Sequence, residues 1–303
     1  MGRNNMFLAC AVFVILLVFS GSALGAGKGE VTTILEEEIA KGAKEEISFK
    51  SDSYFRYFPS HRLSAQSGRV SVTDAETEQS CELKAFGKLP VDFSIDTRYI
   101  GIENSSAVSL PPNLTAVTIG TEIIGPFLKL NKTYLFAGFY PSWSGSNWEF
   151  RPSAFRIPMA YSVIYKPNEK LVLMAGVGVY PDYEHEVLPL FGLSYIPNDK
   201  LSFYLMPPKP NITYALNKKI SLFAEGRFSN NECEVDKDGF KNVVLVYRET
   251  HAGCGVKYSF NTNAFLSLSG GQSFWRRFRY RDSLGKVSIK DGPYINLRLE
   301  IKI

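Results

Sequence analysis

The sequence is poor in cysteine and histidine, and this scarcity limits the site chemistry that it can hold. It has four cysteines and three histidines. Cys10 lies in a segment that we expect to be removed, and Cys81, Cys233 and Cys254 are odd in number and irregularly spaced. Such a set fits neither a disulfide framework nor a metal site. We therefore expect no metal and no cofactor.

Long hydrophobic runs are absent after Gly25, and neither sign of charge predominates. The mean hydropathy is close to neutral, which is too low for a bundle of membrane helices. It does not exclude a membrane β-barrel, because only every second residue of a barrel strand faces lipid. The net charge of +4 is mild and indicates no nucleic acid or other polyanionic partner.

The N-terminus has the three regions of a secretory signal peptide. Met1–Arg3 is cationic, residues 6–19 are apolar, and residues 20–25 are small. The apolar run is shorter than the roughly 20 residues of a membrane anchor, which is the alternative. We therefore predict a signal peptide over residues 1–25.

The next segment differs from the rest of the chain. Residues 26–46 are charged and have no strand pattern, so we expect a periplasmic lead that is helical or disordered. Its acidic run at residues 36–38 is most simply a solvated face, with a plug or a partner hook as the alternative. Residues 47–303 then form one barrel domain.

Four polar turns share one design, in which a tyrosine is followed by two other residues and an asparagine. They span residues 165–168, 195–198, 214–217 and 258–261. Asparagine tolerates the left-handed region and can hydrogen-bond its own backbone, which suits a hairpin turn. The connections at the other strand ends differ in length and composition. Short uniform turns on one side and long variable loops on the other are typical of a transmembrane β-barrel.

The segments between turns alternate apolar and polar residues with the period of a β-strand. Residues 90–99 and 220–228 show this, and the last segment, from Ile295 to Ile303, is the most regular. The period alone fits both a soluble sandwich and a membrane barrel. The signal peptide, the turn asymmetry and a last strand that reaches the final residue favour the barrel.

The turns also give a strand count. With two further short turns near residues 85–88 and 129–132, about twelve strands lie between residues 68 and 280, and one more closes the chain. A strand near residues 47–58 would begin the sheet. We therefore predict an all-β, antiparallel, up-and-down transmembrane β-barrel of about 14 strands, or about 12 without the first, with both ends on the short-turn side. Pro207–Pro210 predicts a tight outer connection.

Several segments of the C-terminal half bear a family resemblance. They are Phe155–Pro158, Tyr165–Lys170, Gly176–Gly178, Leu188–Lys200, Pro210–Asn217, Tyr247–Glu249 and Asp291–Tyr294. Through them the chain resembles the uncharacterised bacterial outer-membrane β-barrel proteins, from about residue 152 to residue 303 and more faintly before. The resemblance implies an outer-membrane barrel without an assigned activity, and it supplies no catalytic or binding residue.

The polar strand faces supply side chains of both signs that we expect to line the lumen. The candidates are Asp92, Asp96, Arg98, Glu122, Glu225, Arg227, Glu249, His251 and Arg298. A barrel of about 14 strands holds a lumen unless a loop or the lead blocks it. Mixed charges argue against strong ion selectivity, or they pair as structural bridges. Ile100, Ile102 and Phe223 on the same face hint at an apolar path.

These observations predict a passive channel or transporter for small solutes in the bacterial outer membrane. A structural or surface-interaction barrel without a conducting pore is the alternative, and an embedded lipid-modifying enzyme is the third reading. His61 and His185 fall in predicted loops. His251 points toward the lumen, where Glu249 or Arg248 would satisfy it, whereas a lipid-cleaving site must meet the bilayer. We therefore expect no enzymatic activity.

One segment combines four arginines with four aromatic residues, over residues 274–281 in a predicted loop. Guanidinium groups suit phosphates and aromatic rings suit the membrane interface. Arg276, Arg277, Arg279 and Arg281 are therefore candidates for contact with lipopolysaccharide, and a generic aromatic girdle with solvated charges is the alternative. A surface for single-stranded nucleic acid does not fit an exported protein.

The implied partners are outer-membrane lipids, lipopolysaccharide and, during biogenesis, the barrel assembly machinery. The sequence leaves open the oligomeric state, the solute and whether the lumen is plugged.

Overall fold

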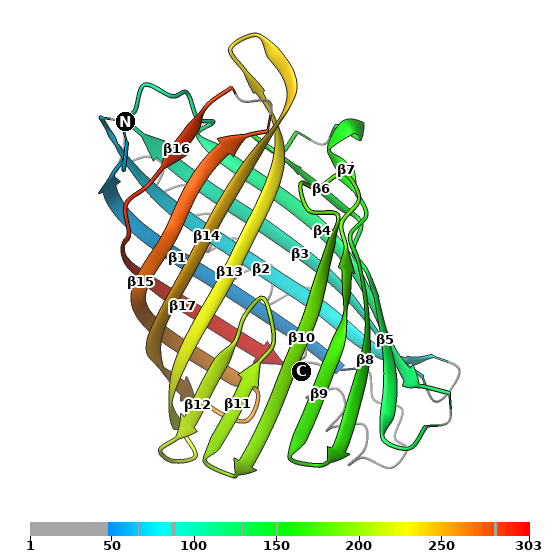
Figure 1. The fold of residues 1–303 in the computed structure, drawn as a ribbon. Helices are drawn as coiled ribbons and strands as arrows, with labels where there is room; N and C mark the ends of the chain where they lie inside the picture. Colours follow the sequence, from blue (N-terminus) through cyan, green and yellow to red (C-terminus); the bar gives the residue numbers. More distant parts are fainter. Residues whose placement is uncertain (1–47, 66, 86–88, 129, 150, 282–283) are drawn as a thin grey trace.

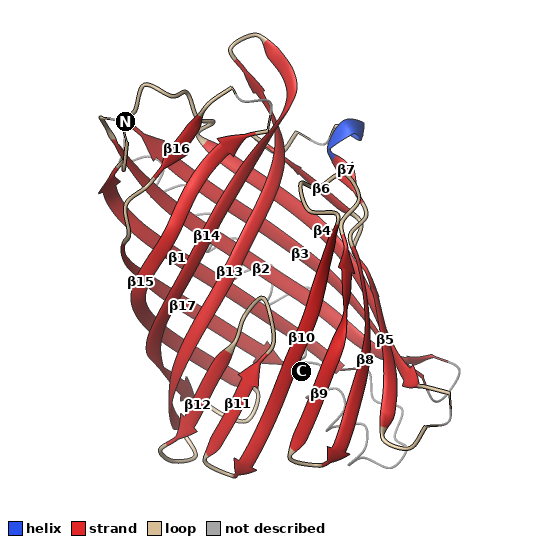
Figure 2. Cartoon of the chain, viewed as in Figure 1, coloured by secondary structure: helices blue, strands red, loops and turns tan. Residues whose placement is uncertain are grey.

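Strands account for nearly all of the regular structure (Figure 2). The computed structural model describes residues 48–65, 67–85, 89–128, 130–149, 151–281 and 284–303. Within them the strands form one closed antiparallel β-barrel of 14 strands (Figure 1). No helix in these ranges is long and apolar enough to span a membrane. The predicted signal peptide and lead lie outside the described residues.

Three wall strands are each divided into two pieces, as β5 with β6, β7 with β8, and β16 with β17. In chain order the elements are β1 (Ser48–Arg62), β2 (Arg69–Ala85), β3 (Leu89–Asn104), β4 (Asn113–Pro126), β5 (Thr133–Phe139), β6 (Ser142–Gly145), the 3₁₀ helix η1 (Pro152–Ala154), β7 (Phe155–Arg156), β8 (Met159–Asn168), β9 (Leu171–Val179), β10 (Val187–Asn198), β11 (Leu201–Leu205), β12 (Asn211–Ala215), β13 (Ile220–Lys237), β14 (Phe240–Ser259), β15 (Ala264–Tyr280), β16 (Lys286–Ser288) and β17 (Gly292–Lys302).

The barrel closes between its first and last described strands. β1 pairs with β2 on one side and with β17 on the other, where Tyr54 lies opposite Arg298. The amide of Phe49 donates to the carbonyl of Ile303 at 2.9 Å, so both strand ends lie on the short-turn rim. The predicted first strand is confirmed, which decides for 14 strands rather than 12.

Side-chain hydrogen bonds build the four asparagine turns. The Oδ1 atoms of Asn198, Asn217 and Asn261 each accept two backbone N–H groups, and that of Asn168 accepts one, at 2.8–3.1 Å. This confirms that asparagine bonds its own backbone in these turns. None of the four has a positive φ, so the expected left-handed conformation is not the reason for asparagine here.

The rim opposite the short turns, which we call the outer rim, is uneven because neighbouring strands differ in length. β13 and β14, with 18 and 20 residues, project as a hairpin, whereas β11 and β12 have 5 residues each and end low in the wall (Figure 1). The predicted tight connection at Pro207–Pro210 joins these two short strands. The difference between the two rims of the barrel therefore comes from projecting strands as much as from the predicted long loops.

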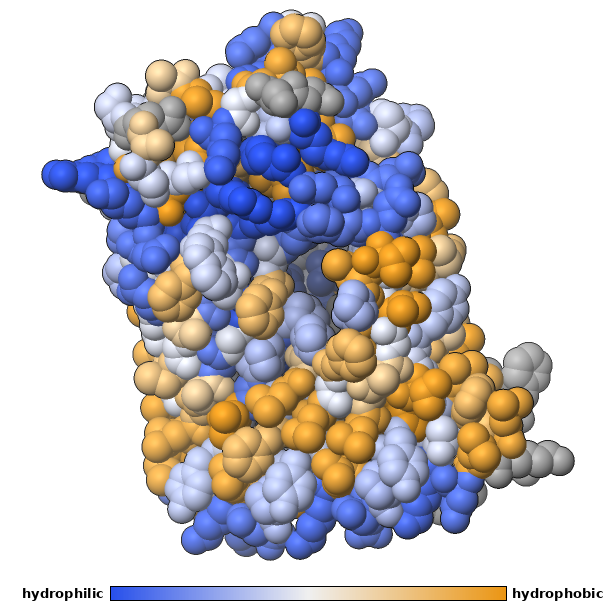
Figure 3. Space-filling view, in the orientation of Figure 1, coloured by the Kyte–Doolittle hydropathy of each residue, from blue (hydrophilic) through white to orange (hydrophobic). Residues whose placement is uncertain are grey.

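The outer face of the wall carries a belt of exposed apolar side chains. Ile95, Ile119, Phe191, Leu268 and Ile295, each on a different strand, are 44–67% exposed. Figure 3 shows the belt across the lower part of one face, with hydrophilic residues above and below it. A continuous apolar band of this kind is the lipid-facing surface of a membrane barrel. The wall therefore spans a membrane.

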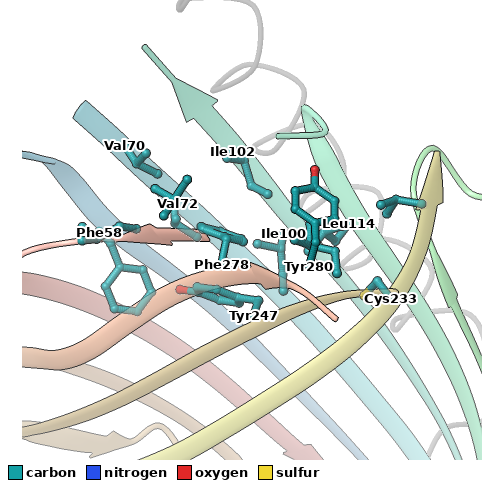
Figure 4. Packing of buried hydrophobic residues seen from close by; sticks show 14 of the residues in the cluster. Phe58, Val70, Val72, Ile100, Ile102, Leu114, Cys233, Tyr247, Phe278 and Tyr280 are labelled. Atoms are coloured by element: carbon teal, nitrogen blue, oxygen red, sulfur yellow. The ribbon is translucent and has the colours of Figure 1, made fainter. Parts of the chain in front are cut away.

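An apolar cluster fills the interior near the outer rim (Figure 4). Side chains of β1–β3 meet those of β13–β15, and the rings of Tyr247 and Phe278 stack at 4.4 Å between centroids. Ile100 and Ile102 belong to this cluster, while Phe223 is half-buried lower on β13. The two isoleucines therefore help to fill the outer end of the barrel and do not line an apolar path.

Two segments predicted as loops are strands. Residues 274–280 belong to β15 and His61 lies on β1, whereas His185 is in a connection as predicted. At Trp275, whose φ is 52°, the pairing of β14 with β15 contains a bulge. A bulge sets two residues against one and reverses the alternation beyond it. It leaves Arg276 buried inside the barrel.

Candidate functional site: a charged interior and an opening in the wall

A network of ion pairs crosses the interior of the barrel. Asp74 on β2 is fully buried and accepts hydrogen bonds from Arg56 at 2.9 Å and from two nitrogens of Arg98 at 2.9 and 2.8 Å. Arg98 also donates to Asn231 on β13 at 2.6 Å. A two-pronged contact fixes the plane of a guanidinium group. The network therefore connects β1, β2 and β3 with the opposite wall.

Glu76 is the next inward-facing acid of β2. It accepts hydrogen bonds from Arg227 and, at 3.0 Å, from Lys209. Its carboxylate also lies within 4.8 Å of those of Glu78 and Asp96, a grouping that could hold a metal ion. Arg227 and Lys209 already neutralise Glu76, and a metal ion there would meet these like charges. We assign no metal role to the three acids.

The structure places all nine predicted lumen residues on the inner face of the wall. Asp92, Arg98, Glu122, Arg227, Glu249 and His251 are buried, and Asp96, Glu225 and Arg298 are half-buried. Several have partners of opposite charge or hydroxyl partners: Arg298 with Asp52 at 2.6 Å, Glu122 with Tyr140 at 2.8 Å, and Glu225 with Ser269 at 2.6 Å. The interior charges are thus arranged mainly in pairs.

Sequence reasoning missed the centre of this network. Asp74, Glu76 and Glu78 alternate along β2, and Arg56 faces them from β1. The period of two could have revealed them. The alternating positions of β2 from Ser71 to Cys81 hold serine, threonine, alanine, glutamine and cysteine, and they do not form the apolar stripe that marks the other strands.

His251 is held as a structural residue. Its Nδ1 lies 3.0 Å from Glu249, as predicted, and its ring packs 4.5 Å from that of Tyr294 and 6.1 Å from that of Phe58. Ser273 is opposite His251 in the β14–β15 register, but its hydroxyl donates to the carbonyl of Gly292 at 2.8 Å. This geometry does not present the serine as a nucleophile activated by the histidine.

A cavity of about 1420 Å³ opens beside β13, above the short strands β11 and β12. Arg227 and Phe228 both line it, and so do Asn230 and Asn231. Successive residues of a strand face opposite sides of the sheet. The cavity therefore reaches from the outer face of the wall to the charged interior around the free edge of β13. Figure 3 shows a hollow in this face between apolar and hydrophilic regions.

The short β11–β12 hairpin creates this wall opening. The last contacts of β13 with that side are the hydrogen bonds from Gly226 and Phe228 to the carbonyls of Pro210 and Pro208. Higher up, β13 next meets the wall at Glu232, whose carbonyl accepts a hydrogen bond from Ser144 of β6 at 2.7 Å, and then at Glu234, which pairs with Gly145 of the same strand. Between these points Leu188, Pro189 and Leu190 of β10 face the cavity from the other side.

Comparison with protein families matches residues 103–301 to the family described as "Domain of unknown function (DUF6268)". This is more than half of the chain. The protein belongs to this family. The match begins upstream of residue 152, where the resemblance seen in the sequence became clear, and it confirms membership of a family without an assigned activity. A search of the curated proteins gives no match.

Among solved structures, similar folds include the COG4313 outer membrane channel from Pseudomonas putida F1, with a TM-score of 0.48 and 11% identity over 86% of this chain and 97% of the other. The P. putida toluene transporter TodX gives 0.40 and 10% over 89% and 91%. The KdgM porin gives 0.32 and 9% over 83% and 98%. Likeness at this level identifies neither the solute nor the activity.

Proposed function

We propose that the protein is a passive channel for small solutes in the bacterial outer membrane, and that solutes pass through the wall opening rather than over the outer rim. One observation carries the proposal: the cavity of about 1420 Å³ is lined by both faces of β13 and ends at the charged interior. Sites for drug-sized ligands measure roughly 300–1,000 Å³, so a small solute fits within it.

The membrane assignment rests on the barrel and on its apolar belt. A closed barrel with an outward apolar band is the architecture of bacterial outer-membrane proteins. The predicted signal peptide supports export to that membrane. In this placement the short-turn rim, where β1 begins and β17 ends, faces the periplasm, and the projecting β13–β14 hairpin faces the cell exterior.

The interior predicts weak ion selectivity. Acids and bases pair across it, as Asp74 does with Arg56 and Arg98, and as Glu76 does with Arg227. Pairing removes the large single-sign field that would favour one ion over another. The interior is therefore expected to discriminate only weakly between small polar solutes of opposite sign.

Planar-bilayer recording of the refolded protein tests the proposal. We expect steady unit conductance from the unmodified protein and a clear reduction in Ser229→Trp, because Ser229 lines the cavity beside Arg98. Phe278→Ala, which enlarges the interior at the outer rim, is the matched variant and should leave conductance nearly unchanged. Heat-modifiable mobility on a gel verifies that each variant is a folded barrel.

Two outcomes contradict the proposal. A folded barrel that is silent in the bilayer rules out a channel and favours the second candidate, a structural or surface-interaction barrel, which the apolar cluster at the outer rim supports. A conducting barrel that responds to Phe278→Ala but not to Ser229→Trp would instead place the pore through the rim.

A further inference from the structure

The outer faces of β14, β15 and β16, with the connection between β16 and β17, concentrate positive charge just above the apolar belt. This basic face consists of Arg248, Arg277, Arg279, Lys286 and Lys290. In the strand register Arg248 lies directly opposite Arg277, and Arg279 lies directly opposite Lys286. Like charges directly opposite each other destabilise a sheet. Anions bound to this surface would reduce the repulsion within these two neighbouring pairs.

The protein itself supplies one anion to the basic face. Glu184, in the β9–β10 connection, accepts a hydrogen bond from Arg248 at 3.0 Å and another from Arg279. Burial raises the pKa of Glu184, but the two guanidinium groups outweigh it and hold that pKa below its usual value. One oxyanion bridging two arginines shows that this geometry accommodates oxyanions.

Positive charge remains in excess beyond this bridge. The outer part of the cavity holds Arg277, Lys286 and Lys290 against one lining acid, Asp291, whereas Arg98 and Arg227 at its inner end pair with Asp74 and Glu76. In the strand register Arg277 and Lys286 lie next to the two arginines that bind Glu184, so the basic face continues outward from that bridge. A ligand with more than one negative charge therefore fits the surface better than a single carboxylate.

Apolar side chains border the basic face on the membrane side. Trp275 is 76% exposed, Phe228 is 56% exposed, and both line the same cavity with Leu188. The bulge at Trp275 produces this arrangement, because it turns the indole outward and Arg276 inward. An amphiphile can thus lay its acyl chains on the belt while its head group meets the cations.

We propose that the basic face binds the phosphate groups of lipopolysaccharide, with the lipid A acyl chains lying against Phe228 and Trp275. The inference rests on the proposed placement in the outer membrane, which sets this face in the outer leaflet. Guanidinium groups contact phosphate oxygens in pairs, which suits the bisphosphorylated head group.

Of the four arginines that the sequence suggested for this contact, two take part. Arg277 and Arg279 face outward on β15. Arg281 donates to the carbonyl of Asp182 at 2.7 Å and approaches Glu232 at 3.5 Å, so it anchors the β9–β10 connection. Arg276 is 1% exposed and lies over the ring of Phe58 at 5.2 Å. It therefore cannot contact lipid.

The test compares lipid A binding to the refolded full-length barrel in detergent, by native mass spectrometry. The probes are lipid A with both phosphates, dephosphorylated lipid A, phosphatidylglycerol and inorganic phosphate. The variant R277Q/K286Q/K290Q is expected to bind bisphosphorylated lipid A about tenfold more weakly. The matched variant K200Q/K218Q/K219Q removes three exposed cations from the short turns and should bind like the unmodified protein.

Several results would overturn the proposal. Equal affinity for both forms of lipid A excludes phosphate recognition, and equal affinity for phosphatidylglycerol shows a surface for any anionic lipid. Displacement of lipid A by millimolar inorganic phosphate shows a site for a free anion. A variant that has lost heat-modifiable mobility is replaced by the single change Lys290→Gln, for which unchanged affinity counts against the site. Lipid A binding is measured without any solute flux. A barrel that binds lipid A but gives no conductance in the planar bilayer would therefore contradict the proposed channel and not the proposed lipid A site.

Discussion

The buried charges of this barrel depend on shared partners more than on isolated pairs. Asp74 is the clearest case, because two arginines from different strands bind one carboxylate that has no exposed surface. Breaking a buried ion pair by removing one partner is strongly destabilising, since the other charge stays buried without compensation. In this network two guanidinium groups would lose their closest carboxylate together, and Glu76, at 3.7 Å from Arg56 and 3.9 Å from Arg98, would be the acid that they still share.

Asp74→Asn is accordingly expected to lower the free energy of unfolding by about 3 kcal/mol. Urea unfolding of the refolded protein in micelles, followed by tryptophan fluorescence, measures this. Asp199→Asn, in an exposed turn, removes the same charge and should cost less than about 0.5 kcal/mol. A loss below about 1 kcal/mol for Asp74→Asn would show that the arginines are hydrated and gain little from Asp74.

At the scale of single elements, the hairpin turns on the short-turn rim repeat one local solution. A carboxamide oxygen caps the backbone N–H groups that follow it, and the next strand begins at once. The chemistry is contained within four or five residues, so sequence alone predicts it. The β11–β12 hairpin is different, because its five-residue strands matter only through the gap that they leave between β10 and β13.

Asn217→Ala removes the acceptor for the amides of Lys219 and Ile220, which lie 2.8 and 3.0 Å from Asn217 Oδ1. We expect a loss of about 1 kcal/mol in unfolding free energy, the net value of a typical hydrogen bond. Asn217→Asp keeps an acceptor at the same place and should behave like the unmodified protein. If both variants are equally weakened, backbone preference and not hydrogen bonding governs the turn.

For the whole molecule, lipid is the solvent of one surface and the charged interior is shielded from it. The apolar belt crosses strands from β3 to β17. Because this surface meets lipid, the apolar residues of each alternating strand face outward and the polar residues face the lumen. Two leucines of nearly equal exposure allow the effect of depth in the membrane on stability to be distinguished from the effect of exposure. Leu268 on β15 is 54% exposed within the belt, and Leu216 is 50% exposed in the turn that follows β12.

Leu268→Arg is expected to destabilise the folded barrel in lipid vesicles by about 2–4 kcal/mol, the cost of arginine near the middle of a bilayer. Leu216→Arg should cost about 1 kcal/mol or less, because the turn lies near the interface. Reversible denaturant unfolding in vesicles gives both values. Equal costs would mean that residue 268 does not meet acyl chains.

The sequence by itself determined the barrel, its strand count to within the first strand, the asparagine turns and the inward face of residues such as Arg98, Arg227 and Glu249. These follow from a period of two and from turn chemistry, which are properties of a few consecutive residues. Only the tertiary structure decided which charges meet, that the short β11–β12 hairpin leaves an opening, and that Arg276 points inward while Arg277 points outward. Pairing across a barrel joins residues far apart in the chain, and one bulge reverses every side chain beyond it.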